Sequence, residues 1–129
     1  PRYWVKAGGA LTALGRENEA MPMFLEALRR EPGRADASYD LGICYAKANR
    51  YAEATGAFRA AVAADGGRPD YRHNLGLMLY AQGKTDSARL VWTEVLQRWA
   101  GYPLTMRSMA LRFGAGAGDS AMAVVPVLP

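Results

Sequence analysis

The feature that most constrains this chain is the regular recurrence of residues of similar size at one fixed spacing. Small residues lie at Gly8, Gly42, Gly76 and Ala110, which are evenly spaced. The same spacing separates Ala20, Ala54 and Ala88; Phe24, Phe58 and Trp92; and Ala27, Ala61 and Val95. This repeat interval, about 34 residues, is typical of proteins in which each repeat packs only against its neighbours. The sequence therefore predicts a row of stacked units in place of one globular core.

Each unit carries the pattern of two α-helices. Apolar residues recur at steps of three and four, which is the helical period. Gly15, Asn49 and Gly83 come where the first helix of each unit must end, and these residue types tolerate a left-handed backbone. We expect the second helices over about residues 18–31, 52–64 and 86–98. Gly8, Gly42 and Gly76 lie inside the first helices, where we expect them to let two helix backbones approach closely.

This pattern resembles the tetratricopeptide repeat (TPR) family, whose helix-turn-helix unit carries Trp, Leu-Gly, Tyr, Ala, Phe, Ala and Pro at fixed offsets. The matching residues are Trp4, Gly8, Ala20, Phe24, Ala27, Pro32, Leu41, Gly42, Tyr45, Ala54, Phe58, Ala61, Leu75, Gly76, Ala88 and Trp92. The resemblance implies an all-α solenoid of antiparallel helix pairs with about seven helices. Its repeats are 1–34, 35–68 and 69–102, and its TPR domain is 1–113.

Residues 103–113 are predicted to form a capping helix, because Met106, Met109 and Phe113 continue the apolar positions of the earlier first helices. The residues of this helix expected to face water are Thr105, Arg107, Ser108 and Arg112. The segment Gly114–Gly118 is too rich in glycine for a helix, so residues 114–129 are predicted to be a Gly/Ala linker and a non-helical apolar tail. We expect the tail to dock on a partner, on a second copy or in the chain's own groove.

The resemblance also implies that the first helices line a concave groove that binds peptides. The predicted lining is Arg2, Val5, Lys6, Gly9, Thr12 and Ala13 in the first repeat; Asp36, Tyr39, Asp40, Ile43, Ala46 and Lys47 in the second; and Asp70, His73, Asn74, Leu77, Tyr80 and Ala81 in the third. Tyrosines supply stiff contact area, and the aspartates favour a ligand with a basic or amide-rich stretch. A plain solvated helix surface is the alternative interpretation.

One subset of TPR domains binds the acidic C-termini of heat-shock chaperones with a clamp of Lys, Asn, Asn, Lys and Arg. Here the matching positions hold Val5, Gly9, Asp40, Asp70 and Asn74. A ligand carboxylate would find none of the cations of the clamp and would meet two aspartates. We therefore predict that this chain does not bind chaperone C-termini in that way.

The sequence favours a non-catalytic protein without a cofactor. His73 and Cys44 are the only residues of their types, which excludes a disulfide within the chain and a metal site with two histidines. We predict that His73 is a polar contact in the groove and that Cys44 is a small buried residue. The glycines follow the repeat interval and not a phosphate-binding or dinucleotide-binding motif.

The charge of the chain, +4 with a pI near 9.5, raises nucleic acid as an alternative partner. The arginines concerned are Arg29, Arg30, Arg34, Arg59, Arg68 and Arg98. Acidic residues alternate with them, which is typical of a solvated helix exterior, so the pattern argues against nucleic-acid binding. No run of apolar residues is long enough to predict a membrane-spanning helix.

Two functional hypotheses follow. The first is a peptide-binding adaptor or scaffold, which the abundance of Ala, Gly and Arg suggests to be bacterial. The second is a structural subunit of a larger complex that docks through its outer face and its apolar tail. The chain starts at Pro1 and not at Met, so an upstream segment or signal peptide is one alternative, and cytoplasm and periplasm both stay open.

Overall fold

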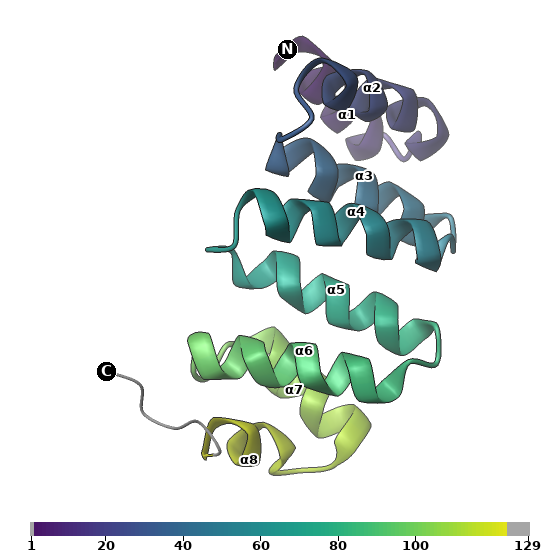
Figure 1. Ribbon diagram of the computed structural model, residues 1–129. Helices are drawn as coiled ribbons and strands as arrows, with labels where there is room; N and C mark the ends of the chain where they lie inside the picture. The colour runs from purple at the N-terminus through teal and green to yellow at the C-terminus, as the bar shows by residue number, and fades with distance from the viewer. Residues whose placement is uncertain (1, 124–129) are drawn as a thin grey trace.

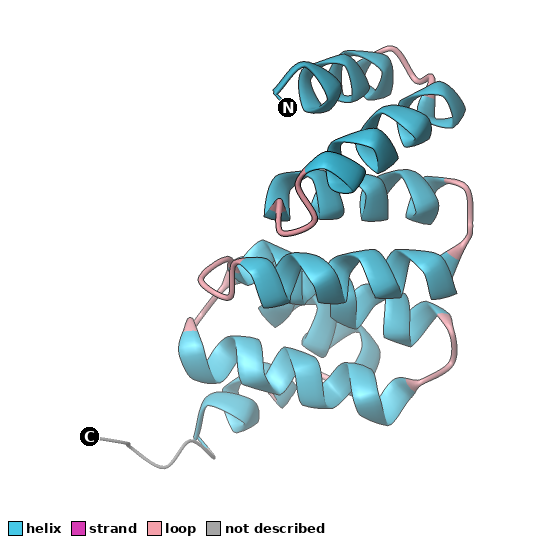
Figure 2. Cartoon of the chain, turned by 45° about the horizontal axis from the view of Figure 1, so that its top comes forward, coloured by secondary structure: helices cyan, strands magenta, loops and turns pink. Residues whose placement is uncertain are grey.

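Residues 2–123, the part of the chain that the computed structural model describes, form eight helices and no strand. They are α1 (Arg2–Ala13), α2 (Glu17–Arg30), α3 (Ala35–Lys47), α4 (Tyr51–Ala64), α5 (Pro69–Ala81), α6 (Thr85–Arg98), α7 (Pro103–Phe113) and α8 (Ala117–Ala123). The helices are stacked in chain order, with α1 and α8 at opposite ends of the stack (Figures 1 and 2). The contacts join helices that are close in sequence, as in a solenoid. The predicted all-α solenoid is confirmed.

The turns between the two helices of each repeat have the same backbone structure in all three repeats. Gly15, Asn49 and Gly83 have φ angles of 75°, 61° and 78°, which is the left-handed region predicted for them. In each turn the backbone N–H of the next residue donates to a carbonyl five residues earlier, at N···O distances of 2.8–2.9 Å. This bond satisfies a carbonyl at the end of the first helix and sets the second helix against it.

The glycines inside the first helices pack against aromatic rings of the second helices. A Cβ atom added to Gly8 would lie 2.6 Å from Cε1 of Phe24, and one added to Gly42 would lie 2.6 Å from Cε1 of Phe58. At Gly76 the added atom would meet the indole of Trp92. The expected approach of two helix backbones therefore needs correction, because each glycine makes room for a ring. The ring fills the space between the paired helices, and all three rings are fully buried.

The C-terminal end of the stack differs from the prediction. Gly114 and Gly116, with φ angles of 101° and 88°, form a turn, and α8 begins directly after it. Gly118 lets α8 approach α7 closely, because a Cβ there would lie 2.6 Å from Sδ of Met106. Ala121 is buried in the contact of α8 with α6 and α7. The prediction of a non-helical segment is thus wrong for residues 117–123, while residues 124–129 and their predicted docking lie outside the described residues.

The capping helix α7 has the predicted bounds, but two of its four predicted water-facing residues are buried. Thr105 is fully buried and Ser108 is 6% exposed, whereas Arg107 and Arg112 are exposed. Thr105 lies one repeat interval after Tyr71, which is also buried. The helix α7 therefore packs in the stack as a further first helix would.

Candidate functional site

The side chains predicted to line the groove come from α1, α3 and α5, and we call the surface that they form the inner face. Its exposed members are Arg2, Lys6, Gly9, Ala13, Asp36, Lys47 and Ala81. Its half-buried members are Val5, Thr12, Tyr39, Asp40, Ile43, Ala46, Asp70, Asn74, Leu77 and Tyr80. His73 alone among the predicted residues is buried. Most of the predicted lining is therefore open to a ligand.

A recess of about 170 Å³ lies on the inner face between α1 and α3. Gly9 and Thr12 of α1, Asp40 and Ile43 of α3, and Phe24 of α2 line it. Because Phe24 is fully buried, its ring closes the recess on the side that faces the core. The structure thus brings together four of the residues predicted for the groove, from two consecutive repeats.

Asp40 is a half-buried carboxylate in this recess. Burial raises the pKa of Asp40 to about 6, and the nearby charge of Asp36 contributes in the same direction. The two other aspartates of the inner face are paired: Asp36 accepts from Arg34 at 2.8 Å, and Asp70 accepts from Arg68 at 3.2 Å. No ion pair within residues 2–123 involves Asp40.

Tyr39 and Asn74 connect two repeats and leave only part of their surface for a ligand. The side-chain amide of Asn74 donates a hydrogen bond to the hydroxyl of Tyr39 at 2.7 Å. The Tyr39 ring stacks on that of Tyr71, with centroids 4.6 Å apart. Burial raises the pKa of the Tyr39 hydroxyl, so this group is neutral near pH 7. Truncating Tyr39 would therefore loosen the contact between repeats as well as remove groove surface.

The predicted role of His73 as a groove contact needs correction. His73 is 4% exposed, and its Nδ1 lies 2.9 Å from the hydroxyl of Thr105 on α7. Its backbone carbonyl accepts a hydrogen bond from Nε1 of Trp92 at 3.1 Å. Burial lowers the pKa of His73 to about 4, with a further contribution from the charge of Arg112. The helix α7 covers this side chain, which sequence reasoning missed because it placed Thr105 in water.

Tyr80 belongs to an aromatic cluster at the C-terminal end of the inner face. Its ring stacks on Trp92 at 6.0 Å between centroids and meets the edge of Phe113 at 6.1 Å. The guanidinium of Arg112 lies 5.1 Å from the centroid of the Tyr80 ring. These contacts hold the ring in place and leave it half-buried.

Two leucines of α7 were missed by sequence reasoning. Leu104 and Leu111 are 50% and 72% exposed, although both are large apolar residues. They lie one repeat interval after Asp70 and Leu77, so the repetition itself places them on a continuation of the inner face. This spacing was visible in the sequence, but α7 was interpreted as a cap, and its residues were therefore not counted among the groove lining.

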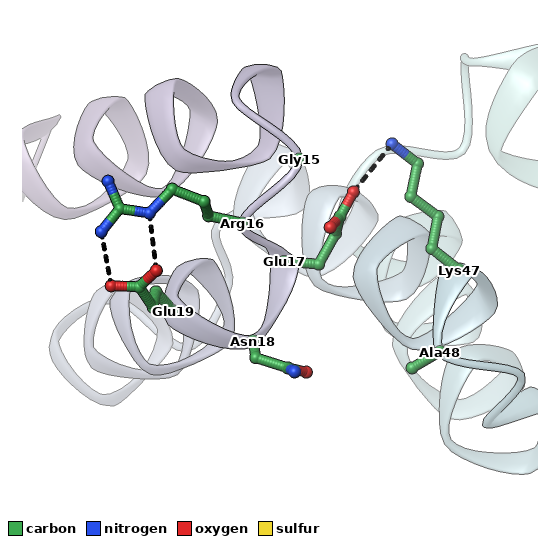
Figure 3. Close-up of a pocket in the computed structure, with 7 residues that line it drawn as sticks. All are labelled: Gly15, Arg16, Glu17, Asn18, Glu19, Lys47 and Ala48. Atoms are coloured by element: carbon green, nitrogen blue, oxygen red, sulfur yellow. Dashed lines mark hydrogen bonds and ion pairs between the residues drawn. The ribbon is translucent and has the colours of Figure 1, made fainter.

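A larger recess of about 480 Å³ lies beside the turn of the first repeat and the end of α3 (Figure 3). Its charged side chains are already paired. Arg16 donates two hydrogen bonds to the carboxylate of Glu19, and Lys47 lies 3.3 Å from Glu17. This surface offers mainly exposed ion pairs, which bind little on their own.

Two further observations concern the described residues. No helix among them is both long and apolar enough to cross a membrane. No three of their His, Cys, Asp and Glu side chains come together in a way that could hold a metal ion.

The fold and the inner face define a class: this protein is a helical-repeat solenoid built from evenly spaced helix pairs. The chain belongs to the tetratricopeptide repeat family. A sequence model of that family matches residues 11–78, and a second one matches residues 70–100. No curated protein matches the chain.

Several solved structures have the same fold at low sequence identity. The alignment with a structure of MamA covers 98% of this chain and 78% of the MamA chain, with a TM-score of 0.79 and 20% identity. The first TPR domain of Spaghetti (RPAP3), bound to the HSP90 peptide SRMEEVD, covers 94% of this chain and 91% of its own, with a TM-score of 0.79 and 16% identity. The type III secretion chaperone SycD of Yersinia enterocolitica, in complex with a peptide of the translocator YopD, covers 95% and 88%, with a TM-score of 0.74 and 14% identity. At these identities the likeness establishes the fold.

Proposed function

We propose that this chain is a non-catalytic interaction module that binds a peptide segment of a partner protein on its inner face. The observation that carries this proposal is the recess between α1 and α3, where apolar and acidic groups from two repeats surround an open space. Peptide-bound structures of the same fold, those of Spaghetti and SycD, support a peptide as the ligand. An adaptor or scaffold acts in this way.

The placement of the two most reactive side chains supports a non-catalytic role. Cys44 is fully buried, and burial raises the pKa of its thiol. His73 is buried beside Thr105 and is neutral near pH 7. A nucleophile or a general base needs access to a substrate, and neither side chain has it.

Four of the six arginines that raised nucleic acid as a partner, Arg29, Arg30, Arg34 and Arg68, are paired with acidic side chains. Arg29 and Arg30 both donate to Glu26, and Arg34 is paired with Glu31 and Asp36. Phosphate binding needs cations whose charge is free to replace counterions. The pairing supports a protein partner over a nucleic acid.

The test compares two leucine variants. Peptides selected by the wild-type protein from a random dodecapeptide display library are titrated, by fluorescence anisotropy, against Leu77→Ser and Leu90→Ser. Leu77 is half-buried on the inner face, and Leu90 is 71% exposed on α6. Losing a buried apolar contact with the peptide should weaken binding about tenfold for Leu77→Ser only. Failure to select any peptide, or equal effects of both variants, would contradict the proposal.

A further inference from the structure

The recess between α1 and α3 has the size of a side chain. Its volume of about 170 Å³ is many times the roughly 10–15 Å³ that one water molecule needs. Its walls combine the apolar Phe24 and Ile43 with the hydroxyl of Thr12 and the carboxylate of Asp40. A recess with apolar walls and one acidic group matches a long side chain that is aliphatic along its stem and cationic at its tip.

Gly9 keeps this recess open. A Cβ atom added to Gly9 would meet nothing within 4 Å, whereas one added to the neighbouring Gly8 would collide with Phe24. Packing therefore explains the glycine at position 8 and not the one at position 9. A glycine inside a helix costs about 0.5–1 kcal/mol relative to alanine, so Gly9 lowers the stability of α1 while it leaves space on the inner face.

Asp40 gives the recess its charge. It is half-buried and, within the described residues, lacks the arginine partner that Asp36 and Asp70 each have. A carboxylate that is partly removed from water and has no cation beside it gains from a cationic ligand, because a charge-assisted hydrogen bond replaces the lost hydration. The hydroxyl of Thr12 donates to the carbonyl of Gly8 at 2.9 Å and lies 3.7 Å from Sγ of Cys44, so one lone pair of its oxygen is left for a donor of the ligand.

We propose that this recess receives a lysine or arginine side chain of the bound peptide, with the stem against Ile43 and the cationic tip on the carboxylate of Asp40. The proposal rests on the proposed function, because it names which side chain the inner face selects. An acidic side chain would be repelled by Asp40, and an apolar one would bury that carboxylate without a partner. The partner protein would therefore present a basic residue to this recess within the segment that lies on the inner face.

The test is a positional-scanning library of acetylated dodecapeptides, in which each position in turn carries each amino acid. Binding is measured for the wild-type protein, Asp40→Asn and Asp36→Asn. The control removes an equal charge from the same helix, but from a carboxylate that is paired with Arg34. We expect Lys or Arg to be preferred at one position by about 10- to 100-fold, and this preference to be lost in Asp40→Asn and kept in Asp36→Asn.

A second pair of variants tests the space itself. Gly9→Leu fills the recess, and Gly56→Leu makes the same change in α4, where an added Cβ also meets nothing within 4 Å. Gly9→Leu should lose the preference for a basic residue, and Gly56→Leu should keep it. A wild-type protein without a basic preference, or a preference that survives Asp40→Asn, overturns the proposal. If such peptides still respond to Leu77→Ser, the proposed function stands and only the recess is wrongly assigned.

Discussion

The N-terminal half of the inner face, formed by α1 and α3, differs from its C-terminal half, formed by α5 and continued by α7, in what covers it. In the N-terminal half, Asp40 lines a recess that no side chain of the described residues fills. In the C-terminal half, His73 lies under α7, bonded to Thr105 and packed against the Trp92 ring. Burial shifts the pKa of both groups, raising that of Asp40 to about 6 and lowering that of His73 to about 4. Within residues 2–123, His73 has a side-chain partner and Asp40 has no ion pair.

This difference shows that the position of a residue in the repeat specifies its place on a helix, but not whether its side chain is buried or open to a ligand. Asp40 and Ser108 are related by two repeat intervals, and yet Asp40 is half-buried while Ser108 is buried. What decides the role is the neighbouring helix. The helix α7 is held by α8, and together they cover the last repeat. We infer that α7 and α8 stabilise the end of the stack by covering His73, and that the recess between α1 and α3 stays open for binding.

The largest expected effect comes from crowding the C-terminal half. Gly76→Ala would place a methyl group against the Trp92 indole, which is fully buried and packed between Tyr80 and Phe113. Because the ring has no space to move into, we expect a loss of about 3 kcal/mol in the free energy of unfolding, measured by urea denaturation.

The same substitution in the N-terminal half is its control. Gly9→Ala adds a methyl group that touches nothing, so it should raise the free energy of unfolding by about 0.5–1 kcal/mol through helix propensity alone. Equal losses in the two variants would contradict the finding that Gly76 packs against a buried ring whereas Gly9 borders open space.

Much of the fold could be predicted from the sequence. The helical pattern predicts second helices over 18–31, 52–64 and 86–98, and the structure has them at Glu17–Arg30, Tyr51–Ala64 and Thr85–Arg98. The left-handed residues Asn49 and Gly83 lie in their predicted turns. These features depend on local backbone preferences, and the same sequence pattern occurs in all three repeats. Each repeat therefore supports the prediction made from the others.

The sequence was less informative where the repeat is incomplete. The helix α8 follows a glycine-rich segment that none of the three repeats contains at the same position, so repetition could not predict it. Its stability comes from tertiary contacts with α6 and α7. The burial of Thr105 and His73 likewise depends on how α7 packs, which helical periodicity does not specify. The recess beside Asp40 was not predictable either, because its volume depends on the distance between two helices and on the lack of a side chain at Gly9.

A smaller effect is expected from the hydrogen bond that closes the C-terminal half. Thr105→Val keeps the shape of the side chain but leaves the buried Nδ1 of His73 without its partner. An unsatisfied buried polar group should lower the free energy of unfolding by about 2 kcal/mol. Thr85→Val, at an exposed position on α6, is the matched control and should change little. A loss of the same size in both variants would show that the bond does not hold α7 in place.

The smallest effect concerns the charge of Asp40 and depends on pH. Because the pKa of Asp40 is raised from its ordinary 3.8 to about 6 in the folded chain, its ionised form destabilises the fold. This penalty is absent below pH 3.8, develops between pH 3.8 and 6, and is complete above pH 6. Asp40→Asn should therefore raise the free energy of unfolding by about 1 kcal/mol at pH 7.5, since water partly screens a half-buried group.

The measurement is the difference between Asp40→Asn and the wild type at pH 7.5 and at pH 4, each by urea denaturation. His73 has the opposite trend, because its lowered pKa makes the fold lose stability as the pH falls from 6.5 towards 4. Taking the difference at each pH removes the His73 contribution, which both proteins share. A gain that is as large at pH 4 as at pH 7.5 would mean that folding leaves the pKa of Asp40 unchanged, so that its ionised carboxylate is no worse solvated in the recess than in the unfolded chain.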